Sequence, residues 1–411
     1  YLLCYIIHIF NYFIHSNFGG TYTMSWVITI TEAIVAVIVV NVGIFYYLYP
    51  DGPYGVGHRQ TVLKGETTPP VSIFYPIHLL TYKNHRNNEE KTSPFLLEGM
   101  DDIKGILNDF EGIPSSLMKD FKMYRLKAVN DADLHNDYTK GEDKLTPVII
   151  SHGLAGNRTS LAATAYQLAS YGCIVYCLNH TDGSATCFKS DPSGENKVYY
   201  GKYDKMKHKC TMAEFRQKQL DGRMKDISQL IDFIKEEAKE IDIDISKLVA
   251  LGYGMGGMTA LEICKEYKEE VNLCVALDPY YSAKAETIIS STDYAISQPL
   301  LILTNENYPE SSFLADYEHK ETNQKVYDDA CKNGSDLNYN LTLKNSAHLV
   351  NLDIALYYSI AFKFFGLIHQ GVDVQETYLR SRDVVVAFLS EHDSLPVKFD
   401  KKVKAVMKRG K

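Results

Sequence analysis

The run from Leu248 to Gly257 (LVALGYGMGG) contains the residues whose types and spacing most suggest chemistry. An apolar stretch enters a glycine-rich bend there, and a helix is expected to leave it. A G-x-S-x-G motif in this setting places a nucleophilic serine on a strained turn between a strand and a helix. Gly254 stands at the serine position and has no side chain that could attack a substrate. The run therefore predicts a hydrolase-like turn without its nucleophile.

Two residues follow this turn in the order typical of an acyl-hydrolase site. Asp278 ends an apolar run, and His348 comes later in the chain. In such sites an acid and a histidine follow the nucleophile, and two backbone N–H groups bind the oxyanion. The N–H groups expected here belong to Leu154, in an early glycine-containing loop, and to Met255, directly after Gly254. Their order favours a vestigial triad of Gly254, Asp278 and His348.

The same glycines also fit a second interpretation. Gly252, Gly254 and Gly257 form a G-x-G-x-x-G pattern after an expected strand, which is the fingerprint of a dinucleotide-binding loop. Asp278 would then bind the ribose. Nicotinamide cofactor binding in a titration would decide for this alternative.

The elements around these residues alternate between strands and helices. Apolar runs predict strands at 147–151, 173–178, 248–251, 273–277 and 299–304, and helical periodicity predicts helices at 159–171, 216–238 and 258–267. Such alternation is typical of an α/β domain with a mostly parallel sheet and helices on both faces.

A series of short segments resembles the platelet-activating factor acetylhydrolase family. They are Gly52–Gly57, Ser151–Leu154, Tyr171–Val175, Asn179–Ser184, Arg216 with Gln219, Gly252–Gly257, Ala276–Asp278 and Ala347–His348. The resemblance covers residues 50–395. It implies an α/β-hydrolase fold and an enzyme that removes short or oxidised acyl chains from phospholipids without a metal.

The resemblance also assigns roles to individual residues. Asp278 and His348 match the family's acid and base, and Leu154 and Met255 match its oxyanion-hole positions. Its nucleophilic serine falls on Gly254. Tyr253, the preceding residue, stands where the family often has histidine.

The composition excludes some classes of function. The chain has 411 residues, 45% hydrophobic content and a formal net charge of −8, and this charge argues against a nucleic-acid partner. The eight cysteines include no Cys-x-x-Cys pair, so a zinc site is not expected and most thiols are predicted to pack in the core. No cofactor is expected.

The N-terminal part of the sequence is apolar. Residues 1–24 form a short apolar segment that either lies at a membrane interface or precedes a true start at Met24. Residues 25–49 are long and apolar enough for a transmembrane helix. Glu32 and Asn41 within it would need protein neighbours. The charge bias places the C-terminal domain on the cytosolic or matrix side. Residues 396–411 are expected to form a basic, solvated tail.

These features together predict a catalytically inactive, membrane-anchored hydrolase-like protein. We expect it to be an accessory subunit of a membrane complex, with the mitochondrial inner membrane as the specific location and a bound lipid as a further partner. The alternatives are an active phospholipid esterase, with another nucleophile or with a water activated by His348, and the dinucleotide-binding protein described above.

Overall fold

The computed structural model describes residues 49–109, 124–139, 143–189, 197–292, 294, 296–309, 314, 317–334, 337–364 and 366–408. Within the chain, Tyr49–Lys411 forms one compact unit. The predicted segment 1–24 and nearly all of the predicted span 25–49 lie outside the described residues. None of the helices that the structure describes has the length and apolar character needed to cross a membrane.

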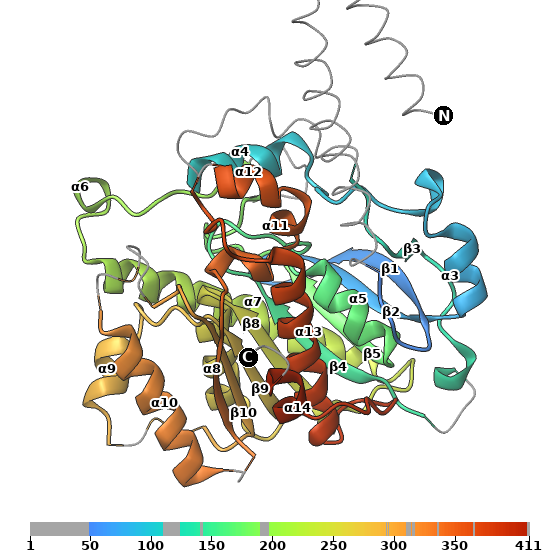
Figure 1. Ribbon diagram of the computed structural model, residues 1–411. Coiled ribbons are helices and arrows are strands. Elements are labelled where there is room, and N and C mark those ends of the chain that lie inside the picture. Colours follow the sequence, from blue (N-terminus) through green and yellow to red (C-terminus); the bar gives the residue numbers. More distant parts are fainter. Residues whose placement is uncertain are drawn as a thin grey trace, which may run out of the picture. The chain divides into compact units, whose positions relative to one another are not determined.

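A nine-stranded sheet forms the centre of this unit (Figure 1). Its strands are β1 (Gly55–Val62), β2 (Pro70–Ile77), β3 (Val129–Asn130), β4 (Thr146–Ser151), β5 (Cys173–Leu178), β8 (Leu248–Tyr253), β9 (Val271–Leu277), β10 (Leu300–Asn305) and β11 (Tyr339–Leu343). The order across the sheet is β11-β10-β9-β8-β4-β5-β2-β1-β3. Neighbouring strands are parallel except where β2 pairs with β1 and with β5. The prediction of a mostly parallel sheet is confirmed.

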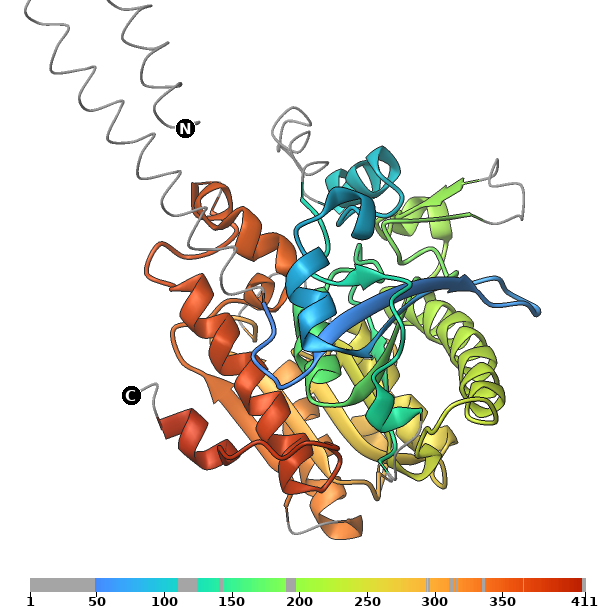
Figure 2. The ribbon, with the colours of Figure 1, turned by 90° about the vertical axis from the view of Figure 1, so that its right-hand side faces the viewer.

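Helices cover both faces of the sheet, as predicted. Helix α5 (Ala162–Ser170) packs on β5 and β2, and α13 (Val374–Glu391) lies beside it. Helix α8 (Met255–Glu266) packs on β8 and β9, and α7 (Met212–Glu237) packs against α8. Figure 2 shows α13 and α7 on opposite sides of the sheet. Helix α7 begins at a capping box, in which Thr211 and Glu214 satisfy each other's backbone N–H groups.

Shorter elements lie around this core. They are α3 (Leu79–His85), α4 (Met100–Asp109), β6 (Cys187–Lys189), β7 (Lys197–Tyr199), α6 (Lys205–His208), α9 (Ala285–Ser290), α10 (His319–Asn333), α11 (Asp353–Tyr357) and α12 (Ser359–Phe364). The cysteines at 173, 177, 187, 264 and 274 are buried free thiols, as core packing requires.

Two parts of the unit differ from the sequence-based expectation. Strands β1 and β2 were not predicted. Strand β1 (GVGHRQTV) mixes glycines with polar residues and shows no apolar run, whereas β2 (PVSIFYPI) is a buried apolar run that the prediction missed. The C-terminal segment holds α14 (Val403–Lys408), which packs against α13 and buries Val403 and Val406. This segment is therefore an integral part of the unit, because its apolar residues recur at a helical spacing.

Candidate active site

The turn between β8 and α8 has the geometry of a nucleophile elbow. Gly254 lies between the two elements with φ +58° and ψ −121°, a conformation that costs an ordinary residue free energy. Its N–H donates to Leu277 O at 2.9 Å, and its carbonyl accepts from Tyr280 N at 2.9 Å. A Cβ on Gly252 would overlap the Gly256 carbonyl oxygen. The strand and helix can approach this closely only because residue 252 is glycine.

This packing also bears on the dinucleotide alternative. A Cβ on Gly257 would come within 3.0 Å of Pro279 Cα, so this glycine, like Gly252, is explained by contact with the protein's own backbone. Asp278, the proposed ribose ligand, is fully buried and already bonded within the site. The glycine run therefore serves the turn itself.

Asp278 and His348 form the acid–histidine pair that the sequence predicted. His348 Nδ1 lies 2.9 Å from Asp278 Oδ2, although the two residues come from loops after β9 and β11. The carboxylate also accepts from Asn305 N and Asn305 Nδ2, both at 2.6 Å. A carboxylate held in this way orients the imidazole and fixes the proton on Nδ1, which leaves Nε2 as the basic atom.

Two tyrosines hold the imidazole ring of His348 from both sides. The Tyr253 ring stacks on it at 4.6 Å between centroids and 19° between planes, and the Tyr308 ring at 4.2 Å and 15°. Tyr253 also donates its hydroxyl to the His348 carbonyl oxygen at 3.0 Å. Tyr253 thus positions the base. Sequence reasoning missed Tyr308 and Asn305, which had no signal beyond following a strand.

His348 faces the elbow at the distance that a triad needs. A Cβ built on Gly254 would lie 3.9 Å from His348 Nε2, 3.8 Å from its Cε1 and 3.5 Å from Gly153 Cα, all ordinary contacts. A hydroxyl at this position would therefore fall within hydrogen-bond reach of Nε2. Gly254 supplies no such hydroxyl.

The predicted oxyanion-hole residues lie beside this position. Leu154 and Met255 both line the pocket above the elbow. Their backbone N–H groups donate to no backbone acceptor in the described part of the chain. The structure thus brings together all five residues predicted for the site: Gly254, Asp278, His348, Leu154 and Met255.

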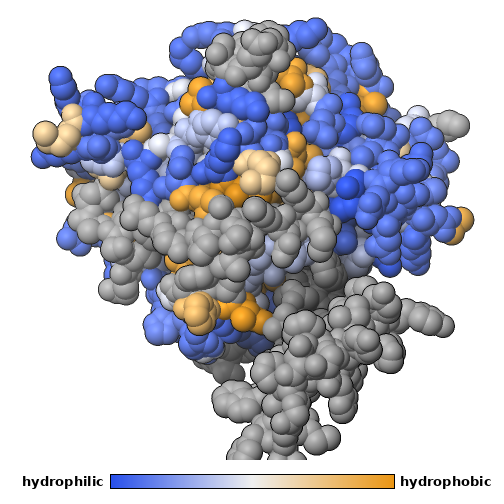
Figure 3. All heavy atoms as spheres, turned by 90° about the horizontal axis from the view of Figure 1, so that it is seen from above, coloured by the Kyte–Doolittle hydropathy of each residue, from blue (hydrophilic) through white to orange (hydrophobic). Residues whose placement is uncertain are grey.

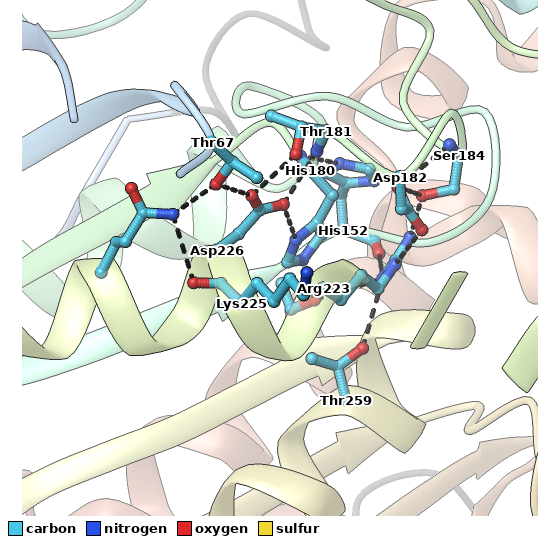
Figure 4. A network of polar contacts seen from close by, with 12 residues as sticks. Thr67, His152, His180, Thr181, Asp182, Ser184, Arg223, Lys225, Asp226 and Thr259 are labelled. Atoms are coloured by element: carbon cyan, nitrogen blue, oxygen red, sulfur yellow. Dashed lines mark hydrogen bonds and ion pairs between the residues drawn. The ribbon is translucent and has the colours of Figure 1, made fainter. Parts of the chain in front are cut away.

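A buried polar network holds the loop that carries Leu154 (Figure 4). The His152 ring accepts from His180 N at 3.1 Å through Nε2, so its Nδ1 carries the proton and donates to Gly153 O at 2.6 Å. Arg223, from α7, donates to His152 O at 2.7 Å and to Ser184 Oγ at 2.7 Å. Side chains of α7 and of the loop after β5 therefore hold the loop that carries Leu154 in place.

Two acidic side chains contact the basic members of this network. Asp182 pairs with the fully buried Arg223 at 3.2 Å, and Asp226 lies 3.3 Å from His180 Nδ1. Burial lowers the pKa values of His152 and His180 well below the ordinary range, and the nearby Arg223 lowers them further. Both rings are thus neutral near pH 7, and the network acts as scaffold.

A pocket of about 920 Å³ opens above the elbow. Its lining includes apolar residues from α4, from the loop that carries Leu154 and from the segments on either side of α12. Two apolar side chains of α12 are exposed to solvent, Ile360 at 49% and Phe364 at 79%. Seen from this end of the unit, apolar residues interrupt a mainly hydrophilic surface (Figure 3). The described residues hold no cluster of three or more side chains placed to bind a metal ion.

The sheet, the elbow and the His–Asp pair define an α/β-hydrolase. The solved structure of a ferulic acid esterase from Streptomyces cinnamoneus has the same fold, with a TM-score of 0.59 and 18% identity over 84% of this chain and 91% of that one.

The chain belongs to the platelet-activating factor acetylhydrolase, isoform II, family, whose model matches residues 48–410. Platelet-activating factor acetylhydrolase from Canis lupus familiaris is 25% identical over 334 residues, covering 70% of this chain and 73% of that protein. The Gallus gallus protein of the same name is 25% identical over 331 residues, covering 72% and 73%.

Proposed function

We propose that this chain binds a short-acyl ester of a phospholipid in the pocket above Gly254, and that its hydrolysis there involves no serine acyl-enzyme. Family membership supports the ester class of ligand. The observation that carries the proposal is Gly254 itself, because the acid, the base and the oxyanion donors surround a position without a hydroxyl. The nucleophile in this proposal is water.

The remaining groups support one route for hydrolysis. A water bound above Gly254 attacks the ester carbonyl carbon while His348 Nε2 takes its proton, and the N–H groups of Leu154 and Met255 bind the carbonyl oxygen as it becomes an oxyanion. The tetrahedral intermediate then expels the alkoxide of the lysophospholipid, which takes the proton back from His348. The products are an alcohol and a short carboxylic acid, which releases its proton to solvent, and Asp278 keeps the imidazole in its orientation throughout.

This route predicts slow turnover with a distinct signature. Without an acyl-enzyme, short-acyl ester hydrolysis shows no initial burst, and a fluorophosphonate probe does not label the native chain. Because general-base catalysis contributes about 10²- to 10⁴-fold, His348→Ala should remove at least about 10²-fold of the rate. Labelling of the native chain that disappears in His348→Ala would refute the proposal, since it would require an enzyme-bound nucleophile.

A second candidate is a non-catalytic role, which the absent nucleophile also favours. In this case the chain keeps the fold and its lipid pocket and serves as an accessory subunit of a membrane complex, with the mitochondrial inner membrane as the proposed site. The apolar residues 25–49 of the sequence support membrane attachment. Recovery of the chain from a mild detergent extract as a free monomer would count against this candidate.

A further inference from the structure

One buried arginine in this structure differs from the others. The described residues contain four buried arginines, at positions 158, 216, 223 and 382. Three of them pair with carboxylates: Arg158 with Glu98 at 2.9 Å, Arg223 with Asp182 at 3.2 Å, and Arg382 with Asp51 at 3.1 Å. Arg216 forms no ion pair with any described carboxylate, although it is only 4% exposed.

The contacts of Arg216 with described residues include no carboxylate that would compensate its charge. One guanidinium nitrogen donates to Gln219 Oε1 at 2.6 Å, and the guanidinium carbon lies 5.2 Å from the Phe215 ring centre and 5.8 Å from that of Tyr280. Its Nε is buried and has no hydrogen-bond partner among the described residues. Burying a cation in this way costs free energy unless an anion binds to it.

Arg216 lines the pocket above the elbow, and the rest of the lining suits an anion. The described lining residues include Lys202, His348 and His369 but no aspartate or glutamate. This bias is local, since the chain as a whole has a formal net charge of −8. Of the described lining residues, Arg216 therefore offers a positive charge to a ligand, and none presents a carboxylate that would repel a negative one.

Tyr280 contacts both the elbow and Arg216. Tyr280 donates its backbone N–H to Gly254 O at 2.9 Å, and its ring lies beside the Arg216 guanidinium. A ligand with its ester carbonyl above Gly254 can thus extend past Tyr280 to reach Arg216. A glycerophospholipid has this arrangement, with a phosphate next to the carbon chain that bears the acyl ester.

We propose that Arg216 forms a phosphate subsite in this pocket, which binds the phosphodiester of the lipid whose acyl ester lies at Gly254. The planar guanidinium presents several N–H donors and suits phosphate oxygens better than an ammonium does. This inference rests on the proposed function, because it names the part of the phospholipid that the pocket recognises besides the ester.

The test compares two ligands that differ only in the phosphocholine headgroup, which contains the phosphodiester. One is dihexanoyl phosphatidylcholine below its micelle-forming concentration, and the other is dihexanoylglycerol. Their affinities are measured for the full native chain, for Arg216→Gln, for Arg216→Lys, and for Lys218→Gln as the control. Lys218 is exposed on the same helix and lies outside the described pocket lining, so this control makes the same charge change without touching the subsite.

Arg216→Gln should weaken binding of the phosphatidylcholine by about 10- to 100-fold, the range for loss of hydrogen bonds to a charged group. Its affinity for dihexanoylglycerol should stay within about threefold of native. The phosphatidylcholine affinity of Arg216→Lys should lie between those of the native chain and of Arg216→Gln. Lys218→Gln should bind both ligands with the affinities of the native chain. Equal phosphatidylcholine affinity in native and Arg216→Gln, or equal losses for both ligands, would overturn the inference.

Inorganic phosphate distinguishes a lipid headgroup from free phosphate as the source of the anion. If phosphate competes with phosphatidylcholine for the native chain but not for Arg216→Gln, the subsite accepts free phosphate as well. Competition that persists in the variant would mean that phosphate binds elsewhere, which would refute the assignment.

If Arg216→Gln does not fold, the native chain must still bind phosphatidylcholine at least about tenfold tighter than dihexanoylglycerol. Native binding of dihexanoylglycerol alone would refute only the subsite, and binding of neither ligand would refute the proposed function.

Discussion

Restoring the missing hydroxyl is the most direct test of the site. In Gly254→Ser the new Cβ would meet Gly153 Cα at 3.5 Å and the His348 ring at 3.8–3.9 Å, so the side chain fits without displacing a neighbour. The backbone at φ +58° disfavours any residue with a Cβ, which should lower the free energy of unfolding by about 1–3 kcal/mol. The pocket itself needs no rearrangement.

The rate effect can be bounded from the parts that are already in place. Removing the serine of an optimised triad costs about 10⁶-fold in kcat. Here the His348–Asp278 pair at 2.9 Å, the two tyrosines that hold the ring and the oxyanion N–H groups are assembled without a serine. We expect Gly254→Ser to raise short-acyl ester hydrolysis by at least about 10³-fold, equivalent to about 4 kcal/mol in the activation free energy.

The assay follows initial rates on a short-acyl nitrophenyl ester together with fluorophosphonate labelling. The matched control is Gly254→Ala, which adds the same Cβ and backbone strain without a hydroxyl. Only Gly254→Ser should gain activity and label, and a second change, His348→Ala, should abolish both. An inactive and unlabelled Gly254→Ser that is folded would refute the reasoning, because it would show that the base does not reach the elbow.

Three further predictions concern stability. Asp182→Asn leaves Arg223 buried without its carboxylate and should lower the free energy of unfolding in urea by about 3–5 kcal/mol. The control Lys225→Gln removes an exposed ion pair and should change the free energy of unfolding by less than about 1 kcal/mol. Equal effects of the two substitutions would contradict the role of the network. Gly252→Ala should reduce stability severely or prevent folding, because the new methyl overlaps the Gly256 carbonyl oxygen, and an unchanged melting temperature would disprove the described turn. Burial lowers the pKa of His319 from 6.5 to about 4, so the unfolded chain binds more protons between these values and stability falls as the pH drops below 6.5. From pH 7 to pH 5 the native chain should therefore lose about 2 kcal/mol more than His319→Gln, and parallel pH profiles would show that His319 is not responsible.

Apolar runs in the sequence were enough to predict five of the central strands of the sheet. Strands β4, β5, β8, β9 and β10 are apolar runs bounded by turn residues, and their limits differ from the predicted ones by at most two residues or so. Strand β1 was invisible to the same reasoning, because its glycines and polar residues become a strand only through pairing with β2. Tertiary contacts decided this element.

The sequence by itself determined the chemistry that is available and the chemistry that is absent. It placed glycine at position 254, and it ordered Leu154, Met255, Asp278 and His348 as an acyl hydrolase orders them. These are facts of residue type and order along the chain.

The tertiary structure decided how these residues act, because the decisive contacts join residues far apart in sequence. Tyr308 stacks on His348, Asn305 bonds the Asp278 carboxylate, and Tyr280 lies between the elbow and Arg216. Whether a buried charge is paired depends on what the fold brings near it. That Arg216 is buried without an ion pair to any described carboxylate could therefore be recognised only once those carboxylates had been placed.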